Sequence, residues 1–511
     1  MARQDTWSQG MTARIVDEVD CIIAAFAERG ITVVPFPDGR GLGYLYAEGD
    51  LLVLEQHLED VRVSLLRQDV PILPPRQPKD GEPTQEGQAP QGDVPQDGEV
   101  PQQDFTRILP GLVLLRIAGP AVPTVVEGID QDLGEGCATP NHVFTVAGNG
   151  GGYNPDETVG PCAATDPEEV IEGTEPYPGI CHCNSGAGVR VYIADTGLIP
   201  DTASYVTGNE VVLQGGPQHP WLAGVRGDED PLSPGLQGEL LKPYAGHGTF
   251  AAGVMRCIAP AADIYVGNVF KTAGSALETD FVPDLQRALN RGTDIFHISV
   301  ASTTRKNLTP LSFWTWLEQL RKHKGIVCVA PAGNSGSRRP HWPGASPEVA
   351  SVGALAADWR NRASFSNYGG WVDAYAPGRN LINAYGNGRF DCSMFPHSQP
   401  EQGQEQQEPQ QEQHRQGHAH RYFYGMAQWS GTSFSSPILT GLIADRMWRN
   451  GENGIEAAAA ILRAARYHAI PGVGAIVLPC GEDRGCRCTE DRGCRCADTP
   501  RRAQLSQPPW R

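Results

Sequence analysis

The sequence lacks a long apolar run and an excess of positive charge. The longest apolar stretch near its start, Cys21 to Ala27, is far shorter than the roughly 18 residues that a membrane-spanning helix needs. With 41 Lys and Arg against 59 Asp and Glu, the formal net charge is −18 at pH 7. A phosphate-binding surface needs a basic face, so this charge argues against a nucleic-acid partner. The composition therefore predicts neither a membrane span nor nucleic-acid binding.

The first residues also lack a secretory signal. The stretch MARQDTWSQGMTARIVDEVD is polar and charged throughout, with no basic segment followed by an apolar one. We therefore expect a cytoplasmic protein, although secretion by a route without a recognisable signal stays open. The 13 cysteines leave at least one thiol unpaired and do not decide the redox compartment.

The sequence is rich in glycine and proline, with 60 and 42 among 511 residues, and is long enough for one large domain with smaller appendages. The predicted parts are a small α/β region at 1–72, a Pro/Gln-rich linker at 73–104, a second folded stretch at 105–148, a Gly/Pro-rich connecting loop at 149–185, the main domain at 186–475 with a low-complexity insertion at 397–420, and a Cys/Arg-rich tail at 476–511. The linker and the insertion have almost nothing apolar to bury, which predicts disorder in both.

Both N-terminal stretches read as small α/β units. Apolar periodicity predicts a helix from Ile15 to Phe26, followed by short strands at 31–36 and 43–47. In the second stretch, RILPGLVLLRIAG reads as one strand, VPTVVEGIDQDLG as a helix and HVFTVAG as a further strand.

The main domain alternates short apolar strands with helices. The predicted strands are VRVYIA, DIYVGNVF, DIFHISVA and GIVCVAPA, and the helical patterns between them include FAAGVMRCI and LSFWTWLEQLRKH. This alternation predicts an α/β fold with a parallel sheet and crossover helices. Catalytic groups should then lie at the C-terminal ends of the strands.

Three side chains in this domain suit nucleophilic catalysis. Asp195 closes a buried strand, His247 precedes a helical pattern, and Ser433 stands between Gly431 and Pro437, where we expect the first turn of a long helix. A serine hydroxyl is a poor nucleophile until a base takes its proton, and that base must be oriented by a third group. We therefore assign Ser433 as the nucleophile, His247 as the general base and acid, and Asp195 as the group that orients His247.

An attacked carbonyl becomes an oxyanion, which needs preorganised hydrogen-bond donors. The loop PAGNSGS follows a predicted strand and offers the side-chain amide of Asn334, and the backbone N–H of Ser433 supplies a second donor. Each motif alone is weak. All four in the order Asp, His, Asn, Ser, each at the end of an element, predict a serine peptidase.

The segments VYIADTG, GHGTFAAGVM, DIFHISVAS, VAPAGNSGS and SGTSFSSP resemble the motifs of subtilisin-like serine peptidases, peptidase family S8, over about 186–475. The resemblance implies a three-layer α/β fold with a central, mostly parallel sheet. It implies an endopeptidase that hydrolyses peptide bonds through an acyl-enzyme on Ser433, with a protein or peptide as substrate.

The chain departs from the family pattern in two places. Ser299, Val300 and Ala301 stand where the family usually has Ser-Leu-Gly, and Phe250 stands where a second histidine is common. We expect the backbone of 299–301 to bind an extended substrate, with Ala332 and Gly333 also in contact with it. The extra methyl of Ala301 should narrow the cleft, so the cleavage preference stays open.

The stretch from Phe105 to Gly148 resembles the second half of the family's N-terminal prosegment, through ATPNHVFTV. On that resemblance, residues 12–148 would form an inhibitory and folding-assisting prosegment, with self-cleavage near or after Ala147. The alternative is an unrelated docking domain.

No cofactor and no catalytic metal are expected, although the resemblance leaves a structural calcium ion open. The cysteines of the tail could bind a soft metal, but the CxxC spacing typical of such sites is missing, which favours free thiols. Two other functions are kept: a scaffold in which catalysis is dispensable, and a dedicated maturation protease for one partner protein. The oligomeric state is not predicted.

Overall fold

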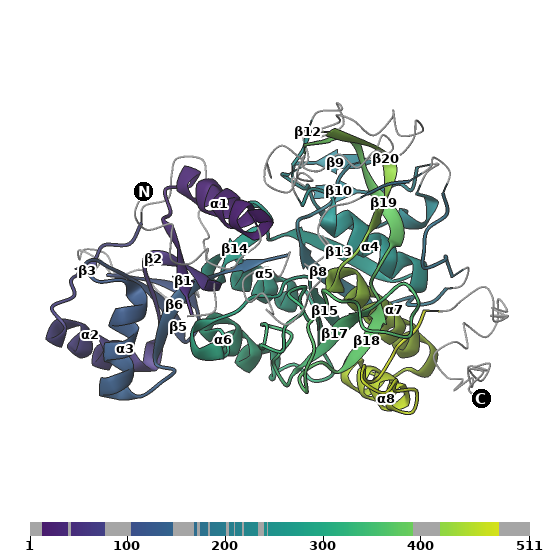
Figure 1. Ribbon diagram of the computed structural model, residues 1–511. Coiled ribbons are helices and arrows are strands. Elements are labelled where there is room, and N and C mark those ends of the chain that lie inside the picture. The colour runs from purple at the N-terminus through teal and green to yellow at the C-terminus, as the bar shows by residue number, and fades with distance from the viewer. Residues whose placement is uncertain are drawn as a thin grey trace, which may run out of the picture. The chain divides into compact units, whose positions relative to one another are not determined.

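The computed structural model (Figure 1) describes residues 13–38, 42–76, 104–146, 168–170, 174–181, 184–200, 204–208, 210–216, 219–232, 240–242, 244–391 and 420–479. The chain divides into two compact units. The larger comprises 1–46 with 142–511, and the smaller comprises 47–141. Most of the predicted linker, insertion and Cys/Arg-rich tail lies outside the described residues.

A nine-stranded sheet forms the centre of the larger unit, in the order β18-β17-β16-β15-β8-β13-β11-β10-β9. The bounds are β8 (Arg190–Asp195), β9 (Tyr205–Thr207), β10 (Glu210–Val212), β11 (Arg226–Asp228), β13 (Asp263–Asn268), β15 (Ile295–Ile298), β16 (Val327–Pro331), β17 (Val349–Leu355) and β18 (Ala374–Pro377). All neighbouring pairs from β18 to β11 are parallel, and β9 and β10 extend the edge antiparallel. The mostly parallel sheet predicted from the alternating pattern is confirmed.

The strands of this sheet read as continuous apolar runs because both faces are covered. Every residue of β15, β16 and β17 is buried. The helices are α4 (His247–Ile258), α5 (Glu278–Asn290), α6 (Leu311–Leu320), α7 (Thr432–Asn450) and α8 (Gly454–Arg466). α7 packs on β15 to β18 and on α4, while α5 packs on α6. The α/β class is therefore confirmed, and none of the described helices is long and apolar enough to cross a membrane.

A second sheet of the larger unit has the order β12-β19-β20-β7. Its strands are β7 (Glu168–Glu169), β12 (Leu240–Leu241), β19 (Leu381–Asp391) and β20 (His420–Trp429). β19 and β20 pair antiparallel from Leu381 with Trp429 to Asp391 with His420. The predicted low-complexity insertion therefore lies between these two strands in the chain. The Asp391–His420 pair brings the two ends of the intervening segment together.

The N-terminal residues of the larger unit contact the main domain predicted at 186–475. They comprise α1 (Ala13–Glu28), β1 (Val33–Pro37) and the first residues of β2 (Leu42–Leu54). The Arg29 guanidinium bonds the Thr272 hydroxyl and the Asp280 carboxylate, both at 3.0 Å. Strand β14 (Ser275–Leu277) pairs antiparallel with the end of β6 (Ala138–Thr145).

The smaller unit is an antiparallel α/β unit with helices α2 (Leu58–Arg67) and α3 (Val122–Leu133) and strands β3 (Ile72–Leu73), β4 (Phe105–Leu109) and β5 (Leu112–Ile117) beside the end of β2. The single strand predicted from RILPGLVLLRIAG is wrong, because this stretch folds into the β4–β5 hairpin. Gly111 takes a φ of +91°, a left-handed conformation that glycine adopts without steric cost and that lets the chain reverse.

Candidate active site

Asp195 and His247 meet at the end of β8 and the start of α4. The Nδ1 atom of His247 lies 2.8 and 3.0 Å from the two carboxylate oxygens of Asp195, and both side chains are buried. The backbone N–H of Thr196 also donates to Asp195, at 2.7 Å. With the carboxylate accepting from Nδ1–H, the other ring nitrogen, Nε2, is the one that can take up a proton.

Two glycines beside His247 allow this approach. Gly246 precedes α4 with a φ of +76°, a conformation that other residues rarely adopt. At Gly248 an added Cβ would lie 2.4 Å from the carbonyl oxygen of Gly197, so any side chain there would push the helix away from the turn after Asp195. The small residues in the AGHG motif therefore set the distance between base and carboxylate.

Ser433 is the second residue of α7, and its side chain is buried. The helix begins at Thr432, so Pro437 lies inside it rather than in its first turn as we expected. The proline removes one N–H that would bond the carbonyl of Ser433, a loss confined to the start of the helix. The consequence is that Ser433 stands at the helix N-terminus itself, with its backbone N–H among the donors that no helical carbonyl pairs with.

Asn334 follows β16 and is oriented by the residue before the nucleophile. Its side-chain oxygen accepts from the backbone N–H and the hydroxyl of Thr432, at 2.9 and 2.8 Å. The hydroxyl of Thr432 in turn accepts the N–H of Gly333 at 3.0 Å. These bonds fix which end of the amide carries the N–H donors. Sequence reasoning missed Thr432 as the residue that orients this amide, although its place in the GTS motif was a signal.

The described contacts of Ser433 do not include a hydrogen bond to His247. Its hydroxyl donates instead to the carbonyl oxygen of Val146, at 3.3 Å. The imidazole stays adjacent, with its ring centroid 4.9 Å from that of Phe434, the residue after the nucleophile. The structure thus joins Asp195 to His247 and Asn334 to the start of α7, while a peptide carbonyl of the chain itself faces the serine.

Residues 143–146 lie along two backbone edges next to Ser433. On one side they pair with β14, and the N–H of Val146 donates to the carbonyl of Gly274 at 3.0 Å. On the other side the N–H of Ala301 donates to the carbonyl of Thr145 at 3.4 Å. The hydroxyl of Ser302 donates to the carbonyl of Val143 at 2.9 Å.

The predicted substrate-contacting residues Ser299, Val300, Ala301 and Ala332 are all buried. A Cβ added to Gly333 would lie 3.3 Å from the Cβ of Ala301, so the two predicted edges are neighbours. Of these residues, Ala301 is the one that hydrogen-bonds the extended segment.

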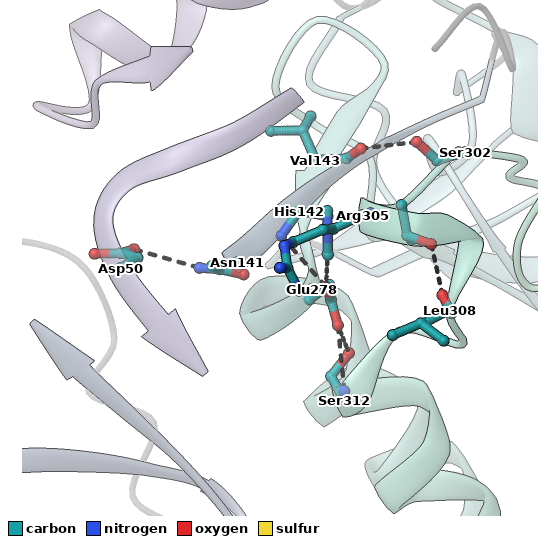
Figure 2. Close-up of polar contacts among 10 residues, drawn as sticks. Asp50, Asn141, His142, Val143, Glu278, Ser302, Arg305, Leu308 and Ser312 are labelled. Atoms are coloured by element: carbon teal, nitrogen blue, oxygen red, sulfur yellow. Dashed lines mark hydrogen bonds and ion pairs between the residues drawn. The ribbon is translucent and has the colours of Figure 1, made fainter. Parts of the chain in front are cut away.

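A buried polar cluster holds the residue before that segment. Figure 2 shows His142, Glu278, Arg305 and Ser312 around one another. The Nδ1 atom of His142 lies 2.5 Å from Glu278 Oε1, and its Nε2 accepts the N–H of Arg305 at 3.1 Å. The other oxygen of Glu278 accepts the N–H and the hydroxyl of Ser312. Glu278 begins α5 and Ser312 lies in the first turn of α6, so one carboxylate lies at two positive helix ends.

The model of the subtilase family matches residues 186–473 of this chain, which is more than half of its length. The chain belongs to the subtilase family. Subtilisin Savinase of Lederbergia lenta is 26% identical over 210 residues, which cover 39% of this chain and 68% of that protein. Thermitase of Thermoactinomyces vulgaris is 28% identical over 214 residues, covering 39% and 66%. The alkaline protease of Shouchella clausii is 26% identical, and the match spans about half of its length, 48%.

Among solved structures, fervidolysin of Fervidobacterium pennivorans matches with a TM-score of 0.46 and 16% identity, covering 87% of this chain and 61% of that one. The membership places this subtilase among serine-type endopeptidases, whose substrates are proteins or peptides.

An aromatic cluster surrounds the imidazole of this subtilase, and the sequence analysis did not foresee it. The rings of Trp429 and Phe434 lie 5.5 and 4.9 Å from that of His247. Phe250 packs on both, with centroids 5.6 and 4.5 Å away. Phe250 therefore packs against apolar rings at the position where the family often has a second histidine. It lies one helical turn after His247. Trp429 and Phe434 thus pack directly against the imidazole, which is buried, and Phe250 packs behind them.

Two further buried histidines lie near the site. His297 in β15 places Nε2 at 2.9 Å from the hydroxyl of Ser436, one turn after the nucleophile. His341 places Nδ1 at 3.0 Å from the carbonyl of Arg339 and Nε2 at 3.2 Å from Ser335 Oγ. Burial lowers the pKa of both imidazoles to about 4, because the charged form would lose its hydration. Both are therefore neutral at pH 7 and unsuited to the role of base.

The cysteines and acidic groups of the described residues form no further centre. Cys21, Cys137, Cys257 and Cys328 are free thiols. Within the described parts of the chain, no group of three or more His, Cys, Asp or Glu side chains could hold a metal ion.

Proposed function

We propose that this subtilase hydrolyses peptide bonds through an acyl-enzyme on Ser433. The observation that carries the proposal is the position of the Ser433 hydroxyl, 3.3 Å from the carbonyl oxygen of an extended peptide segment that lies along two backbone edges. This contact places the Ser433 hydroxyl next to a peptide carbonyl, and acyl transfer depends on such proximity.

The proposed steps use groups whose positions are described above. His247 Nε2 takes the proton of the Ser433 hydroxyl as its oxygen attacks the scissile carbonyl carbon, and Asp195 stabilises the imidazolium through Nδ1–H. The oxyanion accepts from the Asn334 amide and the Ser433 backbone N–H. The intermediate then collapses, His247 gives its proton to the leaving amine, and a water molecule later hydrolyses the Ser433 ester by the same route.

Labelling with a fluorophosphonate tests this function, because the reagent phosphonylates a serine only when a base has activated it. The wild type should be labelled on Ser433, and Ser433→Ala should not react. Ser435→Ala, which removes a buried hydroxyl one position beyond Phe434, is the matched control and should react like the wild type. A folded wild type that has lost its N-terminal residues and still does not react would favour the scaffold function instead.

We further propose that the residues before 147 act as a prosegment of this enzyme. Support comes from the backbone pairing of 143–146 with β14 and with Ala301, and from the contact between Val146 and Ser433. The cleavage expected near or after Ala147 falls outside the described residues. A segment held by so many backbone bonds blocks access of other peptides until it leaves.

A further inference from the structure

A second buried carboxylate lies behind the Asp195–His247 pair. Asp230 follows β11 and is fully buried. Its Oδ2 atom accepts the hydroxyl of Thr196 at 3.0 Å and the N–H of Gly246 at 2.7 Å, and its Oδ1 atom accepts the N–H of Leu232 at 2.8 Å. Thr196 is the residue after Asp195, and Gly246 is the residue before His247. One carboxylate therefore ties together the two chain segments that carry the base and its partner.

The Thr196 hydroxyl extends this link to the other side of His247. While it donates to Asp230, it also accepts the N–H of Gly248 at 3.2 Å. The backbone on both sides of the imidazole is thus held by Asp230, at Gly246 directly and at Gly248 through Thr196. The N–H of Thr196 meanwhile donates to Asp195.

The charge of Asp230 also affects the Asp195–His247 pair. Burial raises the pKa of its carboxyl to about 7, and the negative charge of Asp195 adds to that rise, while the three hydrogen bonds oppose it. The charged group that acts on this carboxyl is Asp195 at the end of β8. His247 follows Gly246, whose N–H Asp230 accepts, Asp228 and Glu229 precede Asp230 in the chain, and His297 in β15 is neutral at pH 7. Among the residues that the structure describes, no cationic side chain bonds it. When His247 takes up a proton, the new positive charge favours the ionised form of Asp230.

We propose that Asp230 is a positioning residue of this enzyme, which fixes the backbone around His247 and adds a second negative charge that stabilises its imidazolium. The proposal rests on the function proposed above, in which His247 is the base. Asp230 does not touch the substrate and acts only through Thr196, Gly246 and the field at the imidazole.

The test is the pH dependence of fluorophosphonate labelling in the purified full-length protein as produced. Asp230→Asn removes the charge and leaves one amide N–H₂ facing backbone or hydroxyl donors, so the maximal labelling rate should fall roughly 10-fold. The midpoint of the acid limb should move down by about half a pH unit, because without this charge the imidazole loses its proton at lower pH. Asp445→Asn, at a buried carboxylate bonded to Ser185 and Arg449, is the matched control and should leave the midpoint unchanged.

A lower rate with an unmoved midpoint would overturn the electrostatic role, and a profile superimposable on the wild type would overturn both roles. If Asp230→Asn does not fold, Thr196→Val replaces it. This variant removes one hydrogen bond to Asp230, raises its pKa further and should move the midpoint in the same direction. A folded wild type that has lost its N-terminal residues and is not labelled at any pH would instead contradict the proposed function itself.

Discussion

At the scale of single residues, the site contains side chains with two hydrogen-bonding atoms, one of which already bonds another residue of the protein. The Asn334 oxygen accepts two bonds from Thr432, and His247 Nδ1 faces Asp195. In each case the engaged atom determines which other atom can meet the substrate. The orientation is set before any substrate binds, which is the condition for electrostatic stabilisation of a transition state.

Replacing Asn334 with Ala should lower kcat by roughly 10²- to 10³-fold and leave KM nearly unchanged, since the amide acts on the oxyanion and not on the bound peptide. Steady-state kinetics on a peptide substrate measure both constants. Circular dichroism checks that the variant is folded. An effect confined to KM would contradict an oxyanion role for this amide.

His297 should make folding sensitive to acid. Its pKa is about 4 when folded and near 6.5 when unfolded, so the unfolded chain binds more protons between these values. The stabilisation is present above pH 6.5 and is lost as the pH falls through 4, by about 3 kcal/mol. Its Nδ1 atom has no hydrogen-bond partner among the described residues, so a proton there would be buried unpaired.

Urea unfolding of the inactive Ser433→Ala protein between pH 7 and pH 4 measures this loss. His297→Asn, whose amide can still donate to Ser436, should reduce the slope of unfolding free energy against pH. An unchanged slope would assign the acid sensitivity to other groups, of which His341 is the next, because its pKa is lowered as far.

At the scale of elements, each residue to which we assign a catalytic role lies at or just beyond the end of a strand, or in the first turn of a helix. Asp195 ends β8, Asn334 follows β16, His247 begins α4 and Ser433 lies in the first turn of α7. Because parallel strands bring their carboxyl ends to one edge of a sheet, groups far apart in sequence converge there. In the chain, β19 and β20 lie between β18 and α7. The last backbone pair between these two strands joins Asp391 to His420.

Replacing residues 392–419 with a short Gly-containing turn should preserve activity, because a two- to five-residue loop can join the paired ends at Asp391 and His420. Labelling of Ser433 and the thermal midpoint should stay within error of the wild type. Loss of soluble protein would show that the replaced residues take part in the fold.

At the scale of the whole chain, residues from before the main domain reach the nucleophile. Val146 contacts Ser433, and the strand that ends at Thr145 pairs with β14. If the chain cleaves itself there, the wild type should begin near residues 146–152. Ser433→Ala should keep its N-terminal residues, because it lacks the nucleophile.

Mass spectrometry of both purified proteins checks this prediction. An intact N-terminus in a wild type that reacts with fluorophosphonate would favour the docking-domain interpretation over a prosegment. Equal truncation of both proteins would assign the cut to another protease.

Much of the catalytic domain could be predicted from sequence because its signals are local. The buried strands are continuous apolar runs, and Asp195, His247, Asn334 and Ser433 each stand in a motif at an element end. The misses have physical reasons as well. The sequence pattern predicts one strand where the β4–β5 hairpin lies, because the turn between the strands is only two residues long. It also predicts Pro437 in the first turn of the helix, although α7 begins five residues earlier.

The sequence by itself determined the family, the fold class and the four residues assigned to catalysis, because each of these residues lies in a short motif at the end of a helix or strand. Only the tertiary structure revealed the hydrogen bonds of Thr432 and Asp230 and the contact between Val146 and Ser433. These depend on hydrogen bonds between segments tens to hundreds of residues apart, whose partners no local pattern specifies.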